Sequence, residues 1–263
     1  MKKLITVVIA LLFSASLAMG QDWAKQTLEK SPRHGEWVKI KHDNREVQAF
    51  VVYPESKSKA PVVIVIHEIF GLTDWVRTVA DKLAAQGYIA IAPDLLSGAG
   101  PNGGGSSSFS GDDVRKAIMD LNPDQITADL NAVADYGKKL PAANGKLAVT
   151  GFCWGGGQSF RLATNRKDLE AAYVFYGPPP KEFNTITAPV YGFYAGNDAR
   201  IDATIPDAQK GMKDSGKKYD PVTYEGAGHG FMRAGEDPGN TNADNKKAHD
   251  QAWERWLGLL KQL

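Results

Sequence analysis

The feature that most constrains the fold is a glycine-rich segment around the single cysteine of the chain. Residues 151–157 read Gly-Phe-Cys-Trp-Gly-Gly-Gly, so glycines stand two residues before and two residues after Cys153. A short apolar run at 146–150 precedes this segment, and residues 158–163 have the spacing of a helix. The pattern G-x-nucleophile-x-G is typical of a sharp turn from strand to helix, where only glycine lets the two backbones pass closely. The sequence therefore predicts a thiol held above a sheet at the N-terminus of a helix, where free N–H groups can face an oxyanion.

Cys153 has a simpler alternative, because most lone cysteines are small buried apolar residues. In that case the glycines would serve only the turn. The strand before Cys153 and the helix after it favour a reactive thiol instead. An unpaired thiol in an exported protein is also a liability unless it is buried or used.

Residues 1–20 have the pattern of a secretory signal peptide. Lys2 and Lys3 form a short basic start, residues 4–17 are almost wholly apolar, and small residues precede Gln21. The apolar run is short for a membrane span, so we expect cleavage after Gly20 and a periplasmic or secreted protein. An uncleaved N-terminal anchor is the alternative.

The rest of the chain is nearly neutral and has no second apolar stretch long enough to cross a bilayer. Without Lys2 and Lys3, 29 of the 31 basic residues remain, against 30 acidic residues. This balance gives no reason to expect nucleic acid or an anionic membrane as a partner. We expect residues 21–34 to form a polar lead-in and residues 35–263 to form a single domain, which we expect to be monomeric.

Alternating and β-branched runs predict an α/β fold, with a mostly parallel central sheet and helices on both faces. Residues 35–41 and 46–53 alternate apolar and polar side chains around a turn, which predicts an N-terminal β-hairpin. The unbroken apolar run 62–66 predicts a strand that is buried on both faces. An amphipathic helix at 73–85, with Thr73 as its cap, would lead to a parallel strand at 87–92. Further strands are expected at 146–150, 171–176, 189–195 and 219–224, and further helices at 112–120, 122–136, 203–215 and the C-terminus.

One segment, residues 97–111, is rich in glycine and serine. The strand–helix pattern resumes after it, so it is a loop rather than a linker between domains. Ligand sites of parallel sheets lie beyond the carboxyl ends of the strands, and this loop follows such an end. We therefore expect a mobile lid or a substrate-entry loop here.

An acid and a base follow two strands that come after Cys153. Asp198 stands in a turn after the first, and His229 in a glycine-rich turn after the second. Nucleophile, acid, base is the chain order of the α/β-hydrolase fold, so we predict that fold with a triad of Cys153, His229 and Asp198. Asp198 could instead serve only its turn, with Asp202 as its nearest competitor, and His229 could be a surface residue. The other histidines, which lack such a setting, are His34, His42, His67 and His249.

Four segments together resemble the dienelactone hydrolase family of cysteine α/β-hydrolases. A G-x-C-x-G pattern alone is a weak signal, whereas four motifs in order are specific. The resemblance extends over the chain from about residue 35. The segments are His67-Glu-Ile-Phe-Gly71, Gly151-Phe-Cys-Trp-Gly-Gly156, Gly196-Asn-Asp198 and Gly226-Ala-Gly-His-Gly-Phe231.

The resemblance implies roles for further residues. The backbone N–H groups of Ile69 and Trp154 would form the oxyanion hole. Glu68 would meet the resting thiol and help to generate the thiolate when substrate arrives; otherwise it is a strand-end carboxylate in water. Arg233 matches an arginine that binds a substrate carboxylate in the family, and Arg115 is the candidate for a second such arginine.

We therefore expect a carboxylic-ester or lactone hydrolase that forms an acyl-thioester on Cys153. Its partner would be a small ester or lactone, and the reaction needs neither a metal ion nor an organic cofactor. Two other functions stay open. One is a binding protein whose thiol is oxidised rather than acylated, and the other is an acyltransferase that uses the same thioester.

Overall fold

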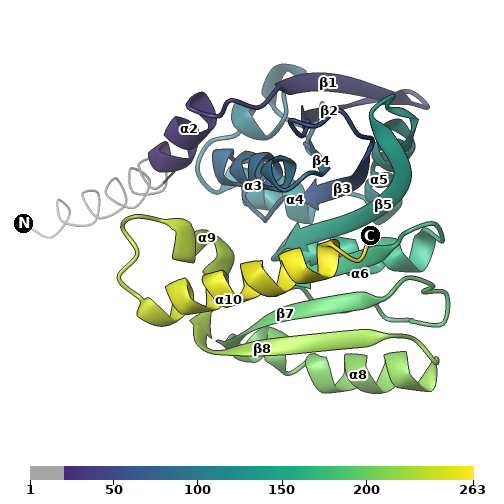
Figure 1. Cartoon of the computed structure of the whole chain (residues 1–263), viewed down its shortest axis with the longest axis vertical. Coiled ribbons are helices and arrows are strands. Elements are labelled where there is room, and N and C mark those ends of the chain that lie inside the picture. Colours follow the sequence, from purple (N-terminus) through teal and green to yellow (C-terminus); the bar gives the residue numbers. More distant parts are fainter. Residues whose placement is uncertain (1–20) are drawn as a thin grey trace, which may run out of the picture.

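The computed structural model describes residues 21–263, and the predicted signal peptide lies outside the described residues. Within them, eight strands form one sheet in the order β1-β2-β4-β3-β5-β6-β7-β8 (Figure 1). β1 (Gly35–His42) pairs antiparallel with β2 (Arg45–Val52), which pairs antiparallel with β4 (Ile89–Pro93). The predicted N-terminal hairpin is therefore confirmed.

The remaining pairs of the sheet are parallel, as the apolar runs predict. Side chains of β3 alternate between two hydrophobic cores, because successive residues of a strand point to opposite faces. Val63 and Val65 enter one core, and Val62 and Ile64 enter the other. The strands of this part are β3 (Ala60–Ile66), β5 (Ala143–Phe152), β6 (Ala171–Phe175), β7 (Val190–Asn197) and β8 (Tyr219–Gly228).

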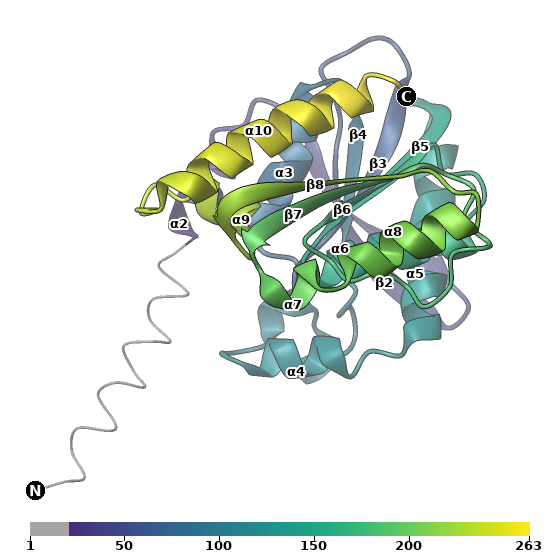
Figure 2. The ribbon, with the colours of Figure 1, turned by 90° about the horizontal axis from the view of Figure 1, so that it is seen from below.

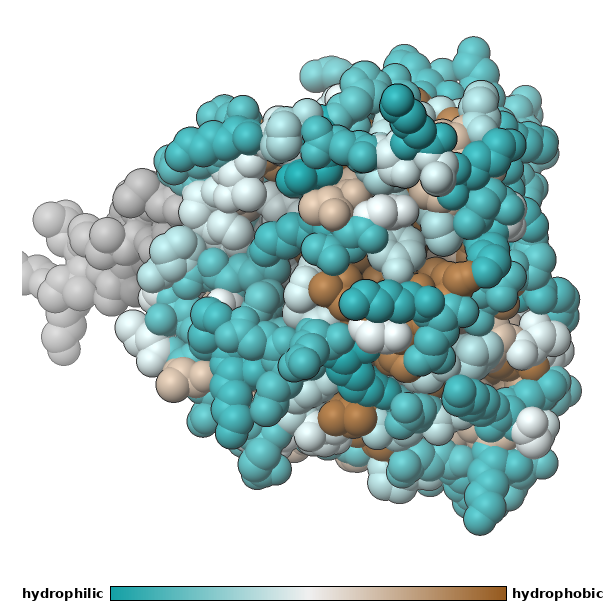
Figure 3. Space-filling model, in the orientation of Figure 1, coloured by the Kyte–Doolittle hydropathy of each residue, from teal (hydrophilic) through white to brown (hydrophobic). Residues whose placement is uncertain are grey.

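Helices cover both faces of the sheet (Figure 2). One face carries α2 (Asp22–Glu29), α3 (Asp74–Ala85), α9 (Phe231–Glu236) and α10 (Ala243–Leu260), and the other carries α5 (Pro123–Lys139), α6 (Trp154–Asn165) and α8 (Ile205–Asp214). Two further helices are α4 (Asp113–Met119) and α7 (Ala199–Asp202). The outer surface on the α10 side is mostly hydrophilic, with hydrophobic residues in small separate areas (Figure 3). Among residues 21–263, none of the helices combines the length and the apolar character needed to cross a membrane.

The helix start at Asn122 is confirmed, and so is Thr73 as the cap residue of α3, although without a side-chain hydrogen bond. The Asn122 side chain accepts hydrogen bonds from Asp124 N at 2.8 Å and Gln125 N at 3.3 Å, and Pro123 is the first residue of α5. This arrangement satisfies two N–H groups that a helix start otherwise leaves free. Thr73 does occupy the position before α3, but its hydroxyl makes no hydrogen bond to the helix.

Three glycines make the turn from β5 to α6 possible. Cys153 has φ 56° and ψ −118°, so the chain reverses sharply at that residue. A Cβ atom at Gly151 would lie 1.9 Å from Gly155 O, and one at Gly155 would lie 2.3 Å from His67 O. A Cβ atom at Gly156 would lie 2.5 Å from the backbone of β6. These neighbours are backbone atoms of a packed sheet, so larger side chains at these positions force the helix away from it.

We predict that Gly151→Ala lowers the free energy of unfolding by about 1–3 kcal/mol or more, because overpacking against fixed backbone has a cost of that order. The matched control is Gly258→Ala in α10, where an added Cβ meets nothing within 4 Å. This control should stabilise the protein by up to about 1 kcal/mol, because alanine is the better helix former. Urea unfolding of both variants measures the difference. Equal stability of the two variants would contradict the tight turn.

Candidate active site

Four strand ends bring the predicted site residues to one edge of the sheet. Glu68 follows β3, Cys153 follows β5, Asp198 follows β7, and His229 follows β8. Because these strands are parallel, their carboxyl ends lie at the same edge, where ligand sites of such sheets are found. Cys153 is partly exposed and precedes the first residue of α6.

The structure brings Cys153, His229 and Asp198 together. His229 Nδ1 hydrogen-bonds to Asp198 Oδ2, and the Cys153 side chain lies close enough to the same imidazole to raise its pKa. Asp198 is buried, so its carboxylate is withdrawn from water. Asp202, the competing carboxylate, lies at the end of α7, and Asp198 is the partner of the ring.

The remaining histidines have other environments. The side chain of each has a contact with a residue other than Cys153. His34 stacks on Tyr53, His42 pairs with Asp129, His67 contacts the backbone of Glu68, and His249 pairs with Glu236.

The position of His229 changes its proton affinity. Burial alone lowers the pKa of this imidazole, but its interactions with Cys153 and Asp198 outweigh burial and raise the pKa to about 9. A proton on the ring is therefore stabilised at neutral pH by the sulfur on one side and the carboxylate on the other.

Glu68 pairs with Arg233 at the same edge of the sheet. The distance from Arg233 Nε to Glu68 Oε2 is 2.7 Å, and Glu68 is only 2% exposed. The alternative of a strand-end carboxylate in water is therefore wrong. The Glu68 carboxylate raises the pKa of Arg233, although burial of the guanidinium opposes this. Cys153 also contributes to the electrostatic environment of Arg233, so the ion pair lies near the sulfur.

Arg115 and Arg233 meet at the ring of Phe70. Their guanidinium carbons lie 4.9 Å and 5.2 Å from the ring centroid. Arg233 comes from α9, which the sequence analysis did not predict, and Arg115 comes from α4. Arg115 has a more exposed side chain and a longer ion pair, 3.4 Å, with Asp112. Two cations thus flank one aromatic side chain beside Glu68.

The two backbone donors expected in the oxyanion hole belong to neighbouring segments. Trp154 begins α6, and the first N–H groups of a helix have no partner within it. Ile69 belongs to the turn that follows β3, and this turn lies against α6 because Gly155 packs on His67 O. In the described part of the chain, no group of three or more His, Cys, Asp or Glu residues has the arrangement of a metal site.

The glycine- and serine-rich segment is anchored at its middle. Ser106 is buried, and its hydroxyl donates to Asp94 Oδ1 at 2.6 Å and accepts from Leu72 N at 2.9 Å. Ser106 N also donates to Asp94 Oδ2 at 2.7 Å. Ser106 therefore anchors residues 97–111. If this segment moved as a whole lid, the hydrogen bonds of Ser106 would have to break.

Sequence reasoning missed Tyr176, which lies directly after β6. Its ring meets the ring of His229 edge-on at 5.1 Å, and its backbone has a φ of 39°. Burial holds the pKa of this phenol well above its usual range, so the hydroxyl stays neutral. Its position one residue past a buried strand, level with the cysteine turn, was the available signal.

The fold and this edge of the sheet define an α/β-hydrolase, and comparisons with known proteins agree. A crystal structure of a "Putative Dienelactone Hydrolase" from Klebsiella pneumoniae superposes with a TM-score of 0.76 at 24% identity and covers 88% of this chain and 99% of that one. Two relatives carry the name "Putative carboxymethylenebutenolidase". The Saccharolobus solfataricus protein is 30% identical, with 84% of this chain and 96% of the relative covered, and the Salmonella typhi protein is 31% identical, with 82% and 83% covered.

The model of the dienelactone hydrolase family matches residues 47–263. The chain belongs to this family, and it is a hydrolase that acts on ester or lactone bonds.

Proposed function

We propose that this protein is an exported carboxylic-ester or lactone hydrolase that works through an acyl-thioester on Cys153. The observation that carries the proposal is the His229 imidazole, which is hydrogen-bonded to the buried Asp198 carboxylate and whose pKa is raised by the neighbouring Cys153 side chain. A nucleophile, a base and a group that orients the base are the parts that acyl transfer needs.

The first half of the proposed reaction forms the thioester. The Cys153 sulfur attacks the ester carbonyl carbon, and the carbonyl oxygen becomes an oxyanion that the N–H groups of Ile69 and Trp154 stabilise. The bond from carbon to the leaving oxygen then breaks, and His229 gives its proton to that oxygen. Asp198 holds the ring through Nδ1 and stabilises its charge while it is protonated.

The second half restores the thiol. Once sulfur is acylated, its negative charge no longer favours a proton on His229, so the ring becomes a better base. His229 takes a proton from water as the water oxygen attacks the thioester carbon. The carbon–sulfur bond breaks and the acid leaves, so His229 keeps the proton that it took from water. The proton that Glu68 accepted from the thiol returns to the sulfur.

We propose substrates that carry a carboxylate. Carboxymethylenebutenolide, to which the relatives' names refer, is a lactone that carries a carboxyl group. Arg233 and Arg115 would bind this carboxylate beside Phe70, where both guanidinium groups already lie. A substrate carboxylate that takes over Arg233 would release Glu68 from its ion pair, and a released carboxylate could accept the thiol proton.

Export is the remaining part of the proposal. It rests on the basic start, the apolar run and the small residues of positions 1–20. Cleavage after Gly20 would leave the chain from Gln21 in the periplasm or outside the cell. Intact-mass measurement of the exported protein identifies the cleavage point.

We predict that Cys153→Ala lowers hydrolysis of p-nitrophenyl acetate to the uncatalysed rate, because no other residue supplies the nucleophile. The release of p-nitrophenol measures this, with a thermal melt to show that the variant is folded. A folded Cys153→Ala protein with wild-type turnover would refute the thioester mechanism.

We predict that Arg233→Ala raises KM about tenfold or more for p-nitrophenyl hydrogen succinate, an anionic ester, because a hydrogen bond to a charged group contributes about 1.5–3 kcal/mol. KM for the neutral acetate ester should change much less. Arg255→Ala is the matched control, because Arg255 also lies over an aromatic ring, at 4.4 Å from the Phe193 centroid, but belongs to α10 outside the site. An equal effect of Arg233→Ala on both esters would remove the role in charge selection.

A further inference from the structure

His67 is a fully buried histidine that the proposed reaction does not use. It follows β3 directly and precedes Glu68 and Ile69. Its ring stacks on the indole of Trp154, with centroids 5.5 Å apart and an interplanar angle of 12°. His67 therefore touches both segments that carry the proposed oxyanion donors, and it does so from inside the protein.

The contacts of the ring determine its protonation state. Leu95 N lies 3.3 Å from His67 Nε2, and a backbone N–H can only donate, so Nε2 must be the acceptor. A neutral ring then carries its proton on Nδ1, which lies 2.8 Å from Glu68 O and donates to it. Burial lowers the pKa of His67, against the opposing charge of Asp94, and so favours this neutral form.

These contacts fix a peptide plane. Glu68 O accepts a second hydrogen bond from Gly71 N at 3.2 Å, so two donors hold this carbonyl on the inner side of the turn. Peptide bonds of the described chain are trans, and a trans peptide points its C=O and N–H in opposite directions. The direction of the Ile69 N–H is therefore set by the bonds to Glu68 O. A flipped peptide would lose both bonds and leave the His67 Nδ1–H unpaired in the interior.

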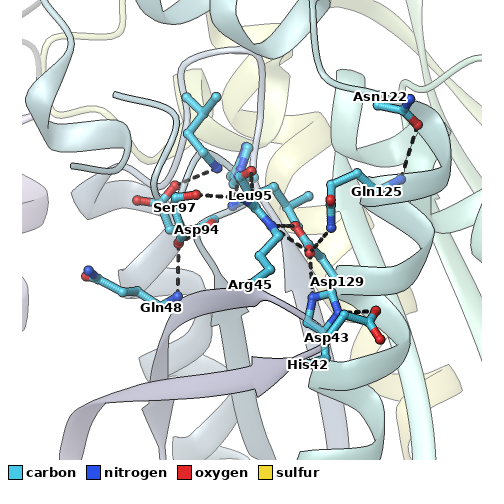
Figure 4. Close-up of polar contacts among 12 residues, drawn as sticks. His42, Asp43, Arg45, Gln48, Asp94, Leu95, Ser97, Asn122, Gln125 and Asp129 are labelled. Carbon is cyan, nitrogen blue, oxygen red and sulfur yellow. Dashed lines mark hydrogen bonds and ion pairs between the residues drawn. The ribbon is translucent and has the colours of Figure 1, made fainter. Parts of the chain in front are cut away.

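The Leu95 backbone, whose N–H donates to His67, is itself held by a polar network (Figure 4). Arg45 donates to Leu95 O at 3.1 Å and to Ser97 O at 2.9 Å, and its guanidinium is paired with the buried carboxylate of Asp129. Asp94 accepts from Leu96 N at 3.0 Å.

Through Ser106, Asp94 also reaches Leu72, at the far end of the turn. The turn is thus tied to the end of β4 at both of its ends.

We propose that His67 is a positioning residue that keeps the Glu68–Ile69 peptide turned so that the Ile69 N–H faces the oxyanion. The oxyanion hole is then formed before substrate binds. This inference rests on the proposed function for its kinetic consequence, but the orientation of the peptide can be tested without any activity.

The first test uses the wild-type protein and does not depend on catalysis. Nitrogen-15 NMR of histidine-labelled protein reports the tautomer of each imidazole, and His67→Asn identifies the His67 signals by their loss. We expect a neutral ring with hydrogen on Nδ1 at pH 7. Hydrogen on Nε2, or a charged ring, would overturn the proposal.

The second test compares two variants in ester hydrolysis. His67→Leu removes both ring nitrogens, whereas His67→Asn keeps an amide N–H near the position of Nδ1. We expect His67→Leu to lower kcat and kcat/KM together by about 10²-fold, with KM little changed, because loss of an oxyanion donor acts on the transition state. His67→Asn should recover most of that loss.

An aldehyde inhibitor separates positioning from a merely structural role. Its hemithioacetal with Cys153 places an oxygen where the oxyanion forms, so its affinity should fall with kcat/KM in His67→Leu and recover in His67→Asn. Equal loss in both variants, or unchanged kcat in His67→Leu, would overturn the proposal. If neither variant folds, the wild-type tautomer decides, because the His67 signals are then those that remain after single substitutions have assigned the signals of the other four histidines. If the wild-type protein hydrolyses no ester, the proposed function fails while the tautomer still tests the peptide orientation.

Discussion

The close passage of backbone at the β5–α6 turn is the constraint on which the site depends. Gly151 and Gly155 allow the helix to begin against the strand ends, and Cys153 is held at positive φ between them. A strained cysteine of this kind persists only where the surrounding structure determines it. Here the buried sheet supplies that support, because β5 lies between β3 and β6 in the middle of the sheet. The sulfur is fixed by packing, and the loops that follow the other strands bring their side chains to it.

Charge around the sulfur is arranged in two pairs. His229 and Asp198 form one, and Glu68 and Arg233 form the other. Each pair has a buried carboxylate, and a buried carboxylate is stable only with a partner. In our proposal the first pair moves protons, while the second couples the arrival of an anionic substrate to the state of the thiol. In our proposal the oxyanion donor at Ile69 belongs to the turn that follows β3, and the contacts of His67 hold that turn.

Sequence patterns predicted the strands and turns that carry this site, because these elements depend on local contacts. The apolar run of β3, the glycines around Cys153 and the Asn-Pro start of α5 each reflect contacts within a few residues. The chain order of Cys153, Asp198 and His229 predicted their meeting, since strand order places their loops at one edge. Their catalytic roles stay predictions.

The parts that escaped prediction depend on partners far apart in the chain. No spacing in the sequence indicates that Glu68 pairs with Arg233 or that Ser106 bonds to Asp94. The glycine-rich composition of residues 97–111 indicated a mobile loop. Composition does not reveal that one serine of the loop hydrogen-bonds to a buried carboxylate elsewhere in the fold. The helix α9 was missed since it has only six residues after a glycine turn.

The most direct test of the central claim is to trap the acylated protein. Wild-type protein mixed with p-nitrophenyl acetate and quenched with acid during the first turnover should gain one acetyl group, and peptide mass analysis should locate it on Cys153. The adduct should disappear as the thioester hydrolyses. Turnover without a Cys153 adduct, or with acylation of another residue that keeps pace with turnover, would contradict the account.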